Sequence, residues 1–427
     1  IKLYKQAKKY IDDVEKLKPE IIGFSNYGWN ENLNKAIGNY TRKILPESLI
    51  VAGGPNIDPG EKERKKFFLN HPYVDLLVVD GGEEPFSEII SWWKDTIRNK
   101  DKLPKNILWM DKNNLRYSGN RELKKQITNI KSPYLSGALD EFINLGMVPL
   151  FETNRGCPFK CAFCAWGSAS KDLVRRMDFD VALEEIKYVG ARSNAKNWIV
   201  CDANFGLLKR DINLANAIRE VKDQTGSPDK CHIWLAKNVT NRNLEIAEIL
   251  GDMIVPVMAV QSLAPDVLKN IKRDNINTET YAAYQNRFHS IGSRTYSDLI
   301  VPLPGETLSS HIKALKDLVE LGVDIIQNHN MRLLPGAETN TPEIRKKFKF
   351  KTKFRLIHGD VSSIKMKNGS SIKAFEYEES LRSTSTMSEK DLFYLRKLHF
   401  LVDFCWNIEV YKPLLQVCLF YKINPID

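Results

Sequence analysis

Residues 154–164 read NRGCPFKCAFC and place Cys157, Cys161 and Cys164 on one short loop with the spacing C-x3-C-x2-C. Three thiolates on one loop can hold three irons of a cubane cluster and leave the fourth iron open. Zinc is the rival, but a closed zinc site needs four ligands, and the nearest histidines, His71 and His232, are remote in sequence. The spacing therefore favours an iron-sulfur cluster over zinc and over thiols packed in a core.

The cysteine loop follows the first of several apolar runs that alternate with helical patterns such as 181–189, 214–221 and 312–321. The runs cover residues 148–151, 198–201, 232–235, 255–260, 299–303 and 323–326. Repeated strand-helix units of this kind predict a partial (β/α)6 TIM-type barrel, whose chemistry is expected at the strand ends.

Upstream of this barrel, the apolar runs 21–25, 49–52 and 76–79 alternate with helical patterns and each leads into a glycine-bearing turn. This order predicts a parallel, doubly wound sheet. In such a sheet ligands bind outside the carboxyl ends of the strands, where glycine lets the backbone approach a bulky group. Ordinary tight turns are the alternative reading.

Composition narrows the class of protein. The chain has 427 residues, of which 43% are hydrophobic and 27% charged, and these values are typical of globular proteins rather than of disordered or collagen-like chains. Its net charge of +10 favours anionic ligands. An odd count of seven cysteines, without a signal-peptide pattern or an apolar run of membrane length, predicts a soluble, cytoplasmic protein with no membrane partner.

The cysteine loop, with Phe163 immediately before the last cysteine and a partial barrel behind it, resembles the radical S-adenosylmethionine (SAM) superfamily. The resemblance implies a 4Fe-4S cluster whose open iron is chelated by the amino and carboxylate groups of SAM. Reductive cleavage of SAM then gives methionine and a 5′-deoxyadenosyl radical. A non-enzymatic metal or iron-sulfur scaffold is a rival, but it would not need polar residues at successive strand ends.

Those polar residues follow four of the predicted strands. The resemblance places Asp202 and Asn204 near the methionine ammonium, and residues after the third and fourth strands near the carboxylate and ribose. It places Glu306, in the turn 303–307, near the adenine. Taken singly, each can also be a turn, a cap or a polar strand end. The residues expected to bind SAM are Phe163, Asp202, Asn204, Lys237, Gln261, Ser262 and Glu306, with Asn238 beside Lys237.

Residues 19–25, 52–55 and 80–86 resemble the cobalamin-binding domain that precedes the barrel in one subfamily of radical SAM enzymes, and residues 333–338 and 378–388 also resemble that subfamily. No D-x-H-x-x-G motif occurs, so the chain supplies no recognisable histidine for the lower face of cobalt. The resemblance implies that the glycine turns hold the corrin. The residues expected to bind cobalamin are Ser25, Tyr27, Gly53, Gly54, Gly81, Gly82 and Glu83.

The expected fold class is α/β, in four segments. Residues 1–125 form a doubly wound (Rossmann-like) cobalamin-binding domain, expected to be truncated at its N-terminus; 126–146 form a linker; 147–340 form the barrel; and 341–427 form a small C-terminal α+β cap. Within the cap, the period-two alternation of Lys347–Arg355 predicts a strand with one basic face. That face is either solvated or binds phosphate or nucleic acid; the lack of a broad basic surface makes nucleic acid unlikely.

Members of the resembling subfamily most often methylate unactivated carbon or phosphorus centres. Radical rearrangement or cyclisation without methyl transfer is the alternative. We expect a small-molecule, lipid or peptide substrate and an electron donor such as flavodoxin or ferredoxin. The candidates for substrate binding are Asn328, Asn330 and Arg332, and those for proton transfer are Tyr377, Glu378 and Glu379; the alternative is that these are merely polar, solvated residues. His358 and His399 are expected to be structural.

Overall fold

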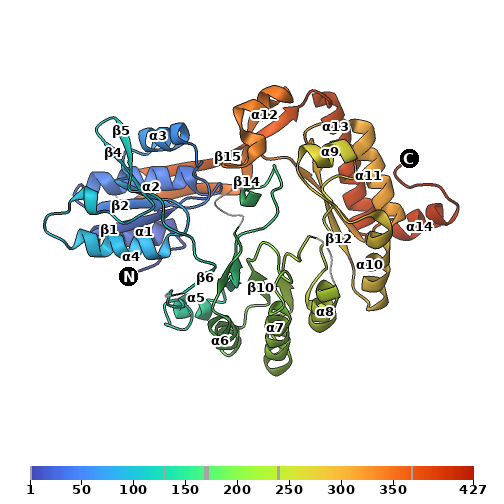
Figure 1. Ribbon diagram of the computed structural model, residues 1–427, viewed down its shortest axis with the longest axis horizontal. Coiled ribbons are helices and arrows are strands. Elements are labelled where there is room, and N and C mark those ends of the chain that lie inside the picture. The colour runs from blue at the N-terminus through green and yellow to red at the C-terminus, as the bar shows by residue number, and fades with distance from the viewer. Residues whose placement is uncertain (1, 129, 168–172, 238–240, 367–368) are drawn as a thin grey trace. The chain divides into compact units, whose positions relative to one another are not determined.

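The computed structural model describes residues 2–128, 130–167, 173–237, 241–366 and 369–427. The chain forms two compact units, which we describe separately (Figure 1). The N-terminal unit contains Ile1–Leu123, Arg332–Gly336 and Lys353–Ser380, and the barrel unit contains Lys124–Met331, Ala337–Thr352 and Leu381–Asp427. The four-segment division by sequence pattern remains a prediction.

The N-terminal unit contains a sheet with the strand order β1-β2-β3-β4-β5. Strands β1 (Ile21–Ser25), β2 (Leu49–Gly53) and β3 (Leu76–Val78) are parallel, as predicted. Strands β4 (Ile107–Asp111) and β5 (Asn114–Tyr117) continue it antiparallel, which corrects the prediction of a wholly parallel sheet. A two-residue turn at Lys112 and Asn113, where Lys112 has a φ of 53°, reverses the chain after β4 and makes β5 antiparallel to it.

Helices cover both faces of this sheet. One core cluster joins Ile22, Ile50 and Leu77 to residues of α1 and α3, and another joins Leu49, Val51 and other strand residues to α4. Alternate strand residues therefore point into two different cores, as a doubly wound sheet requires. The helical elements are α1 (Ala7–Leu17), α2 (Glu31–Ile44), α3 (Glu61–Asn70), α4 (Glu83–Trp93) and the 3-10 helix η1 (Lys100–Lys102).

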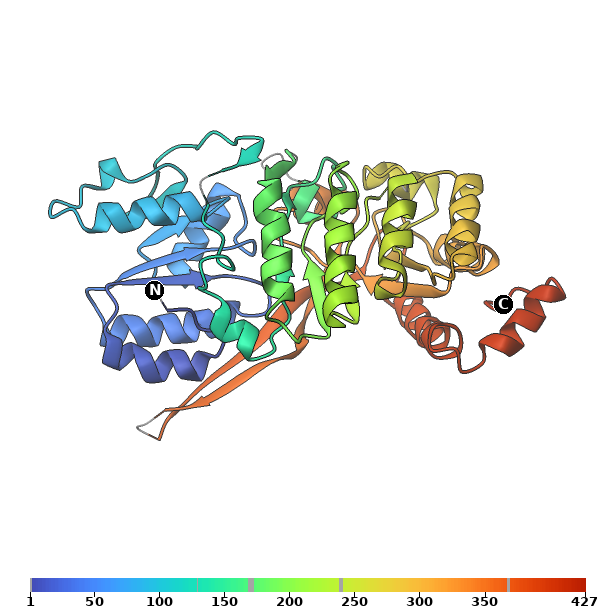
Figure 2. The ribbon, with the colours of Figure 1, turned by 90° about the horizontal axis from the view of Figure 1, so that it is seen from below.

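A long hairpin of β14 (Lys351–Lys365) and β15 (Ser371–Ser383) contributes most of its length to the N-terminal unit (Figure 2). Ile364 packs there with Ile11 of α1 and Ile37 of α2. The predicted basic strand over 347–355 is wrong at its start, because Thr341 and Pro342 begin helix α12 (Pro342–Lys347) and the strand begins only at Lys351.

The barrel unit contains parallel strands in two groups. Strand β10 (Asn197–Val200) pairs with β7 (Leu150–Phe151) and β11 (Lys230–His232), and β12 (Tyr296–Val301) pairs with β13 (Ile325–Asn330). The predicted fourth strand, 255–260, is present among the described residues only as isolated parallel bridges of Val257 to Tyr296 and of Gln261 to Leu299. Pro256 lacks the N–H that a ladder needs, and Gln261 has a φ of 67°, which together interrupt regular pairing.

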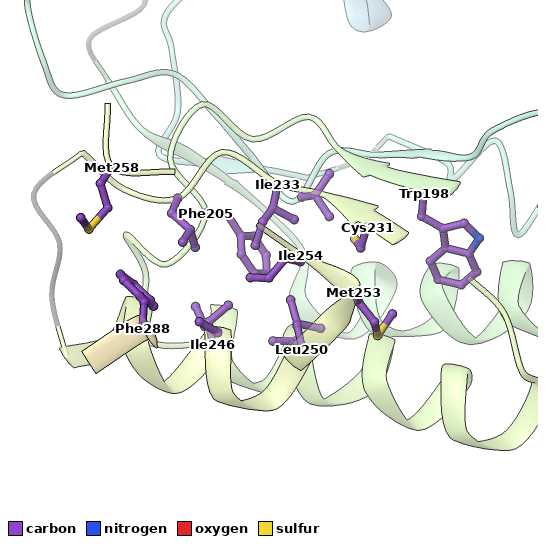
Figure 3. Packing of buried hydrophobic residues seen from close by; sticks show 14 of the residues in the cluster. Trp198, Phe205, Cys231, Ile233, Ile246, Leu250, Met253, Ile254, Met258 and Phe288 are labelled. Atoms are coloured by element: carbon purple, nitrogen blue, oxygen red, sulfur yellow. The ribbon is translucent and has the colours of Figure 1, made fainter. Parts of the chain in front are cut away.

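Helices α6, α7 and α8 lie side by side along the first group of strands (Figures 1 and 2). Figure 3 shows the core that results, in which Trp198, Phe205 and Cys231 face Ile246 and Leu250 of α8. The helical elements of the barrel region are α5 (Asp140–Asn144), η2 (Ala165–Gly167), α6 (Phe179–Gly190), α7 (Asp211–Thr225), α8 (Asn241–Leu250), η3 (Gly251–Met253), α9 (Pro265–Asn270), α10 (Thr278–Ser290), α11 (Leu308–Glu320) and η4 (Glu338–Asn340).

The C-terminal helices α13 (Glu389–Val402) and α14 (Lys412–Phe420) flank a π-helical turn, Asp403–Asn407. The Asn407 side chain donates to the carbonyl of Ile326 at 2.9 Å and accepts from the Ile326 N–H at 2.8 Å. It therefore supplies hydrogen-bond partners to backbone groups of β13. No helix in the described part of the chain combines the length and apolar character that a membrane crossing requires.

Candidate functional site

The cysteine loop is held at both ends by backbone pairing. It follows β8 (Asn154–Arg155), the edge strand of a small sheet with β9 (Arg175–Met177) and β6 (Gln126–Ile127). Gly156 turns the chain with a φ of 104°, a conformation that glycine adopts without strain. Further along, Ala162 donates its N–H to the carbonyl of Ile271 and accepts one from Thr339, both at 2.9 Å. The three cysteines therefore lie on a fixed loop.

Nitrogen donors surround the cysteine sulfurs. The Asn204 Nδ2 lies 3.1 Å from the Cys157 Sγ, the Lys237 Nζ lies 3.1 Å from the Cys161 Sγ, and the Arg273 Nη1 lies 4.0 Å from the same sulfur. Donors and positive charge at this range stabilise thiolates, the form that binds metal. Burial raises the pKa of the Cys164 thiol, which Lys237 opposes. The set of donors fits an anionic iron-sulfur cluster.

No group of three or more His, Cys, Asp or Glu residues in the described ranges is arranged to hold a single metal ion. A cluster takes one thiolate per iron, so its three cysteines need not meet at one point.

Asp202 is fully buried just after β10, and both of its oxygens are engaged. Oδ1 accepts the N–H groups of Thr153 and Asn154 at 2.7 and 3.0 Å, while Oδ2 accepts from the Thr153 hydroxyl and from the Asn154 amide. Burial raises the pKa of this carboxyl to about 6, although the bonds to Thr153 and Asn154 oppose the shift. Arg210 holds the same segment through the Thr153 carbonyl at 2.6 Å. Asp202 thus fixes the residues that enter the cysteine loop.

Two of the predicted SAM-binding residues carry buried oxygens that lack a partner within the described residues. They are the Asn204 Oδ1 and the Gln261 Oε1. An unpaired buried acceptor costs about 1–3 kcal/mol, so such atoms mark the place of a missing donor. An ammonium or hydroxyl donor, as SAM carries at its methionine and ribose ends, matches them.

The structure also joins two predicted residues from neighbouring strand ends. The Ser262 hydroxyl donates to the Glu306 Oε2 at 2.7 Å, and Ser310 donates to the other carboxylate oxygen. Burial raises the pKa of Glu306, and these hydroxyls oppose the rise. Thr386 accompanies them by donating to the Glu306 carbonyl at 2.7 Å. Glu306 is therefore an anchored carboxylate at the end of β12.

The remaining SAM candidates differ in how far the structure describes them. Lys237 lies 5.3 Å over the ring of Phe159 and so faces the cysteine loop. Phe163 is half-buried in that loop, and Asn238 lies outside the described residues. Arg273 is a site residue that sequence reasoning missed, because it stands in a polar stretch after α9 that reads as a solvated turn. Only folding brings it to Cys161, 112 residues away.

In the N-terminal unit, the ends of β1 and β2 come together. Ser25 pairs with Gly53 in the parallel register, and the Asn26 N–H donates to the Gly53 carbonyl at 2.7 Å. Gly54 has a φ of 114°, and a Cβ there would lie 2.4 Å from the Asn26 carbonyl oxygen, so only glycine fits. These turns present backbone rather than side chains.

The third predicted turn lies next to them. Gly82 precedes helix α4, which begins at Glu83, and a Cβ added at Gly53 or Gly82 would lie 3.5 or 3.9 Å from atoms of Val78 at the end of β3. Asp80, just before Gly81, has a φ of 61°. On the first loop, Tyr27 stacks on Trp29 with ring centroids 4.5 Å apart. The predicted cobalamin residues therefore gather at one edge of the sheet.

The predicted substrate residues Asn328 and Asn330 belong to β13 in the barrel unit, whereas Arg332 and the predicted proton-transfer residues belong to the N-terminal unit. Asn328 lies on the same face of β13 as the buried Ile326, and Arg332 pairs with Glu378 at 2.9 Å within the N-terminal unit. His399 is expected to be structural, and it contacts a second histidine. The Nε2 atoms of His399 and His311 lie 2.9 Å apart. Tyr377 is exposed and meets Phe354 edge to face.

The structure adds a polar pair that the sequence analysis did not single out. His329 and Asp298 lie on the opposite face of β12 and β13, with the His329 Nε2 2.8 Å from the Asp298 Oδ1. Arg273, which contacts Cys161, also interacts electrostatically with Asp298. The side chain of His329 is 50% exposed, so a ligand can reach this pair. The pair thus lies on the side of the strands from which Arg273 reaches the cysteine loop.

Comparison with known proteins agrees with this site. Residues 151–318 match the family model described as the Radical SAM superfamily. This segment begins in β7, contains the whole cysteine loop and ends in α11. The segment 151–318 belongs to the radical SAM superfamily, which confirms the resemblance and with it the cluster and SAM that the superfamily shares.

Two curated relatives match most of the chain. One, named 2-(S-pantetheinyl)-carbapenam-3-carboxylate methyltransferase, from Streptantibioticus cattleyicolor, is 34% identical over 76% of this chain and 48% of its own length. The other, named cobalamin-dependent radical SAM methyltransferase TokK, from Streptomyces tokunonensis, is 31% identical over 77% of this chain and 49% of its own length. The chain spans about half the length of these relatives.

Among solved structures, the radical SAM methyltransferase TsrM from Kitasatospora setae, with cobalamin and a 4Fe-4S cluster bound, superposes with a TM-score of 0.62. The match covers 82% of this chain and 69% of TsrM at 13% sequence identity. At that identity the likeness concerns the fold, and it extends beyond the barrel because the matched share of the chain exceeds residues 151–318.

Proposed function

We propose that this chain is the catalytic part of a cobalamin-dependent radical SAM methyltransferase. The observation that carries the proposal is the cysteine loop with nitrogen donors at two of its sulfurs, next to buried amide oxygens for which the described residues provide no donor. The names of the two curated relatives and the bound groups of TsrM support it. Methyl transfer is favoured over rearrangement or cyclisation because those relatives are named methyltransferases.

The chain's own residues hold and orient the cofactors. Cys157, Cys161 and Cys164 would each ligate one iron of the cluster, and Lys237 and Arg273 would offset the negative charge at the Cys161 sulfur. When bound, the cluster and SAM supply a carbon radical that can remove a hydrogen atom from an unactivated centre, and cobalamin supplies a methyl group.

Asn204 and Gln261 accept hydrogen bonds from the ammonium and hydroxyl groups of SAM, and Ser262 and Glu306 form the polar wall at the next strand ends. Asp202 does not contact SAM directly, because Thr153 and Asn154 already donate hydrogen bonds to its oxygens. We therefore assign it the positioning of the cysteine loop in place of the ammonium contact. Phe163 remains a candidate for contact with SAM.

The N-terminal unit binds the corrin. Ser25, Gly53, Gly54 and the turn 81–83 present backbone at one edge of the sheet, where a large flat ligand can come close. Tyr27 lies on the same loop, stacked on Trp29. None of these residues is a histidine, so they would hold the corrin by contact rather than by coordinating cobalt.

The substrate is a polar small molecule that meets the Asp298–His329 pair. With its Nε2–H donated to Asp298, a neutral His329 presents the lone pair of Nδ1 to a hydrogen-bond donor, and a hydroxyl or an amide N–H of the substrate is the simplest such group. The electron comes from a donor such as flavodoxin or ferredoxin, in the cytoplasm. The acceptor atom is an unactivated carbon or phosphorus centre.

An anaerobic reconstitution tests the function. The chain is loaded with iron, sulfide and cobalamin and given SAM, a strong reductant and 2-(S-pantetheinyl)-carbapenam-3-carboxylate, the compound named for one relative. Formation of 5′-deoxyadenosine, S-adenosylhomocysteine and a product one methyl group heavier supports the proposal. Deoxyadenosine without S-adenosylhomocysteine points to rearrangement or cyclisation, and neither product from a cluster-loaded sample contradicts it. A His329→Gln variant should lose methylated product while it still forms deoxyadenosine.

A further inference from the structure

A buried carboxylate from the C-terminal hairpin caps the first turn of α2. The Glu376 Oε2 accepts the Asn32 N–H at 3.0 Å, and its Oε1 accepts the Leu33 N–H at 2.8 Å. The Asn32 side chain also donates to the Phe375 carbonyl at 3.0 Å. Glu376 is only 3% exposed. The N-cap residue of α2, Asn30, makes no capping hydrogen bond of its own to the described helix. Glu376, which is distant in sequence, accepts from the free N–H groups of the first turn in its place.

Asn30 is instead turned towards the loop that precedes the helix. Its Oδ1 accepts the Tyr27 N–H at 2.8 Å, and its Nδ2 donates to the Ser25 carbonyl at 3.0 Å. Ser25 and Tyr27 are two of the residues proposed to face the corrin. The loop thus depends on the orientation of the first turn of α2, which Glu376 fixes two residues further on.

A second link connects this turn to the neighbouring strand end. Glu31 accepts from the Asn56 side chain at 2.5 Å, and the Asn56 N–H donates to the Asn26 carbonyl at 3.2 Å. Burial raises the pKa of Glu31, and the charge of Glu376 raises it further. Apolar contacts hold the hairpin in place, because Ile364 and Ile372 pack with Ile11 and Ile37. The hairpin is therefore anchored independently of Glu376.

We propose that Glu376 is a positioning residue for cobalamin: it caps α2 and thereby sets the loop 25–30 in the shape that receives the corrin. This inference rests on the corrin-binding role proposed for the N-terminal unit. It makes the hairpin, which follows the barrel in sequence, a functional part of that unit. The carboxylate suits the task because the N-terminus of a helix attracts negative charge.

The test measures hydroxocobalamin binding to the full chain by absorbance titration. Glu376→Gln keeps the size of the side chain and removes its charge and one acceptor, and we expect about tenfold weaker binding. Lys373→Gln is the matched control, since Lys373 is exposed on the same strand and should bind as the wild type does. The electron paramagnetic resonance spectrum of bound cob(II)alamin should also change in the Glu376 variant, which mere loss of stability would not cause.

A double-mutant cycle locates the effect. If Glu376 acts through the loop, Asn30→Ala should weaken binding by a similar factor, and the double variant should lose little more than either single variant. Equal dissociation constants and spectra for wild type and Glu376→Gln would overturn the inference while leaving the proposed function standing. A wild-type chain that takes up no cobalamin would overturn both.

Hydrogen exchange on the wild type covers the case in which a variant fails to fold. Hydroxocobalamin should slow amide exchange at residues 25–33 and at 372–377 together, because one network joins them. Slowing at 25–33 alone would show that the hairpin takes no part in binding.

Discussion

In the barrel unit the turns after parallel strands end in buried polar side chains, whereas in the N-terminal unit they end in close backbone contacts. Asn204 and Gln261 carry buried oxygens that no group in the described part of the chain pairs with, and Glu306 is anchored by two hydroxyls. At Gly54, by contrast, there is no room for a Cβ beside Asn26. The strand ends of the barrel unit therefore offer directed hydrogen-bonding groups, whereas those of the N-terminal unit consist of closely packed main chain.

This difference predicts that damage to one edge should leave the ligand of the other edge in place. Removal of a side chain should weaken ligand binding in the barrel unit, where particular side-chain atoms make the hydrogen bonds. Addition of a single methyl group at a turn glycine should weaken ligand binding in the N-terminal unit, because the main chain there leaves no room for a Cβ. Variants with these two kinds of change can therefore separate the two sites.

The largest effect is expected for Cys161→Ala. It removes one of three thiolates and the partner of Lys237 and Arg273, so cluster content and 5′-deoxyadenosine formation should both fall to background. Iron and sulfide analysis, with chromatography of the products, measures this. Cobalamin binding should persist. Cys418→Ala on α14 is the control and should retain the cluster; retention of full activity in Cys161→Ala would refute the assignment of the loop.

Gly54→Ala should produce the converse result. A φ of 114° and a Cβ 2.4 Å from a carbonyl oxygen force the turn to move, and we expect a loss of roughly 3 kcal/mol in the unfolding free energy of this unit together with loss of cobalamin binding. Denaturant unfolding and absorbance titration measure the two effects. Gly28→Ala, whose Cβ would lie 3.6 Å from Asn56, should be mild. Unchanged cobalamin binding in Gly54→Ala would count against the corrin site.

A third variant separates the units by their response to pH. Burial lowers the pKa of His311 to about 4 and that of His399 to about 3, from 6.5. A neutral histidine with a depressed pKa adds stability that is complete above pH 6.5 and is lost as the pH falls below it.

Replacing His399 by Gln should therefore reduce the acid-induced loss of unfolding free energy by about 2 kcal/mol at about pH 5, relative to neutral pH. The pH dependence of denaturant unfolding measures it. The cobalamin affinity of the N-terminal unit should not change, because the pair lies in the barrel unit. If the unfolding free energy of the wild type and of His399→Gln fell equally steeply with decreasing pH, His311 and His399 could not be a neutral buried pair.

The smallest effect is expected for Asn204→Ala, at about tenfold in SAM affinity. The change removes the unpaired Oδ1 and the donor to Cys157 together. Equilibrium dialysis of the cluster-loaded protein with SAM measures the affinity. Asn213→Ala, on the exposed face of α7, is the control. An affinity equal to the wild type would mean that the Asn204 oxygen faces something other than SAM.

The two units also differ in how much of them the sequence reveals. The cysteine loop and the strand ends after β10 and β12 are local patterns that the sequence shows. In the structure Asn204 lies next to Cys157 and Lys237 next to Cys161, while their contacts with SAM stay a prediction. The interrupted strand at 255–260 was not predictable in the same way, since an apolar run does not show whether a proline and a left-handed residue will break its pairing.

Long-range partners could not be read from the chain. Arg273 reaches Cys161 across 112 residues and Glu376 reaches Leu33 across 343, and neither stands in a pattern that marks it. A charged residue in a polar stretch is usually solvated, so its burial depends on which surface folding brings over it. The same holds for the hairpin, whose period-two pattern predicts a strand but not the unit it joins.

By itself the sequence determined the chemistry of this protein, because thiol spacing, glycine turns and strand-end polar residues act over a few positions of one chain. The tertiary structure alone decided which atoms remain for ligands. It assigned both oxygens of Asp202 to the entry of the cysteine loop, left those of Asn204 and Gln261 unpaired, and brought Glu376 to α2. The physical reason is that a hydrogen bond depends on where both partners lie, and the sequence specifies only one of them at a time.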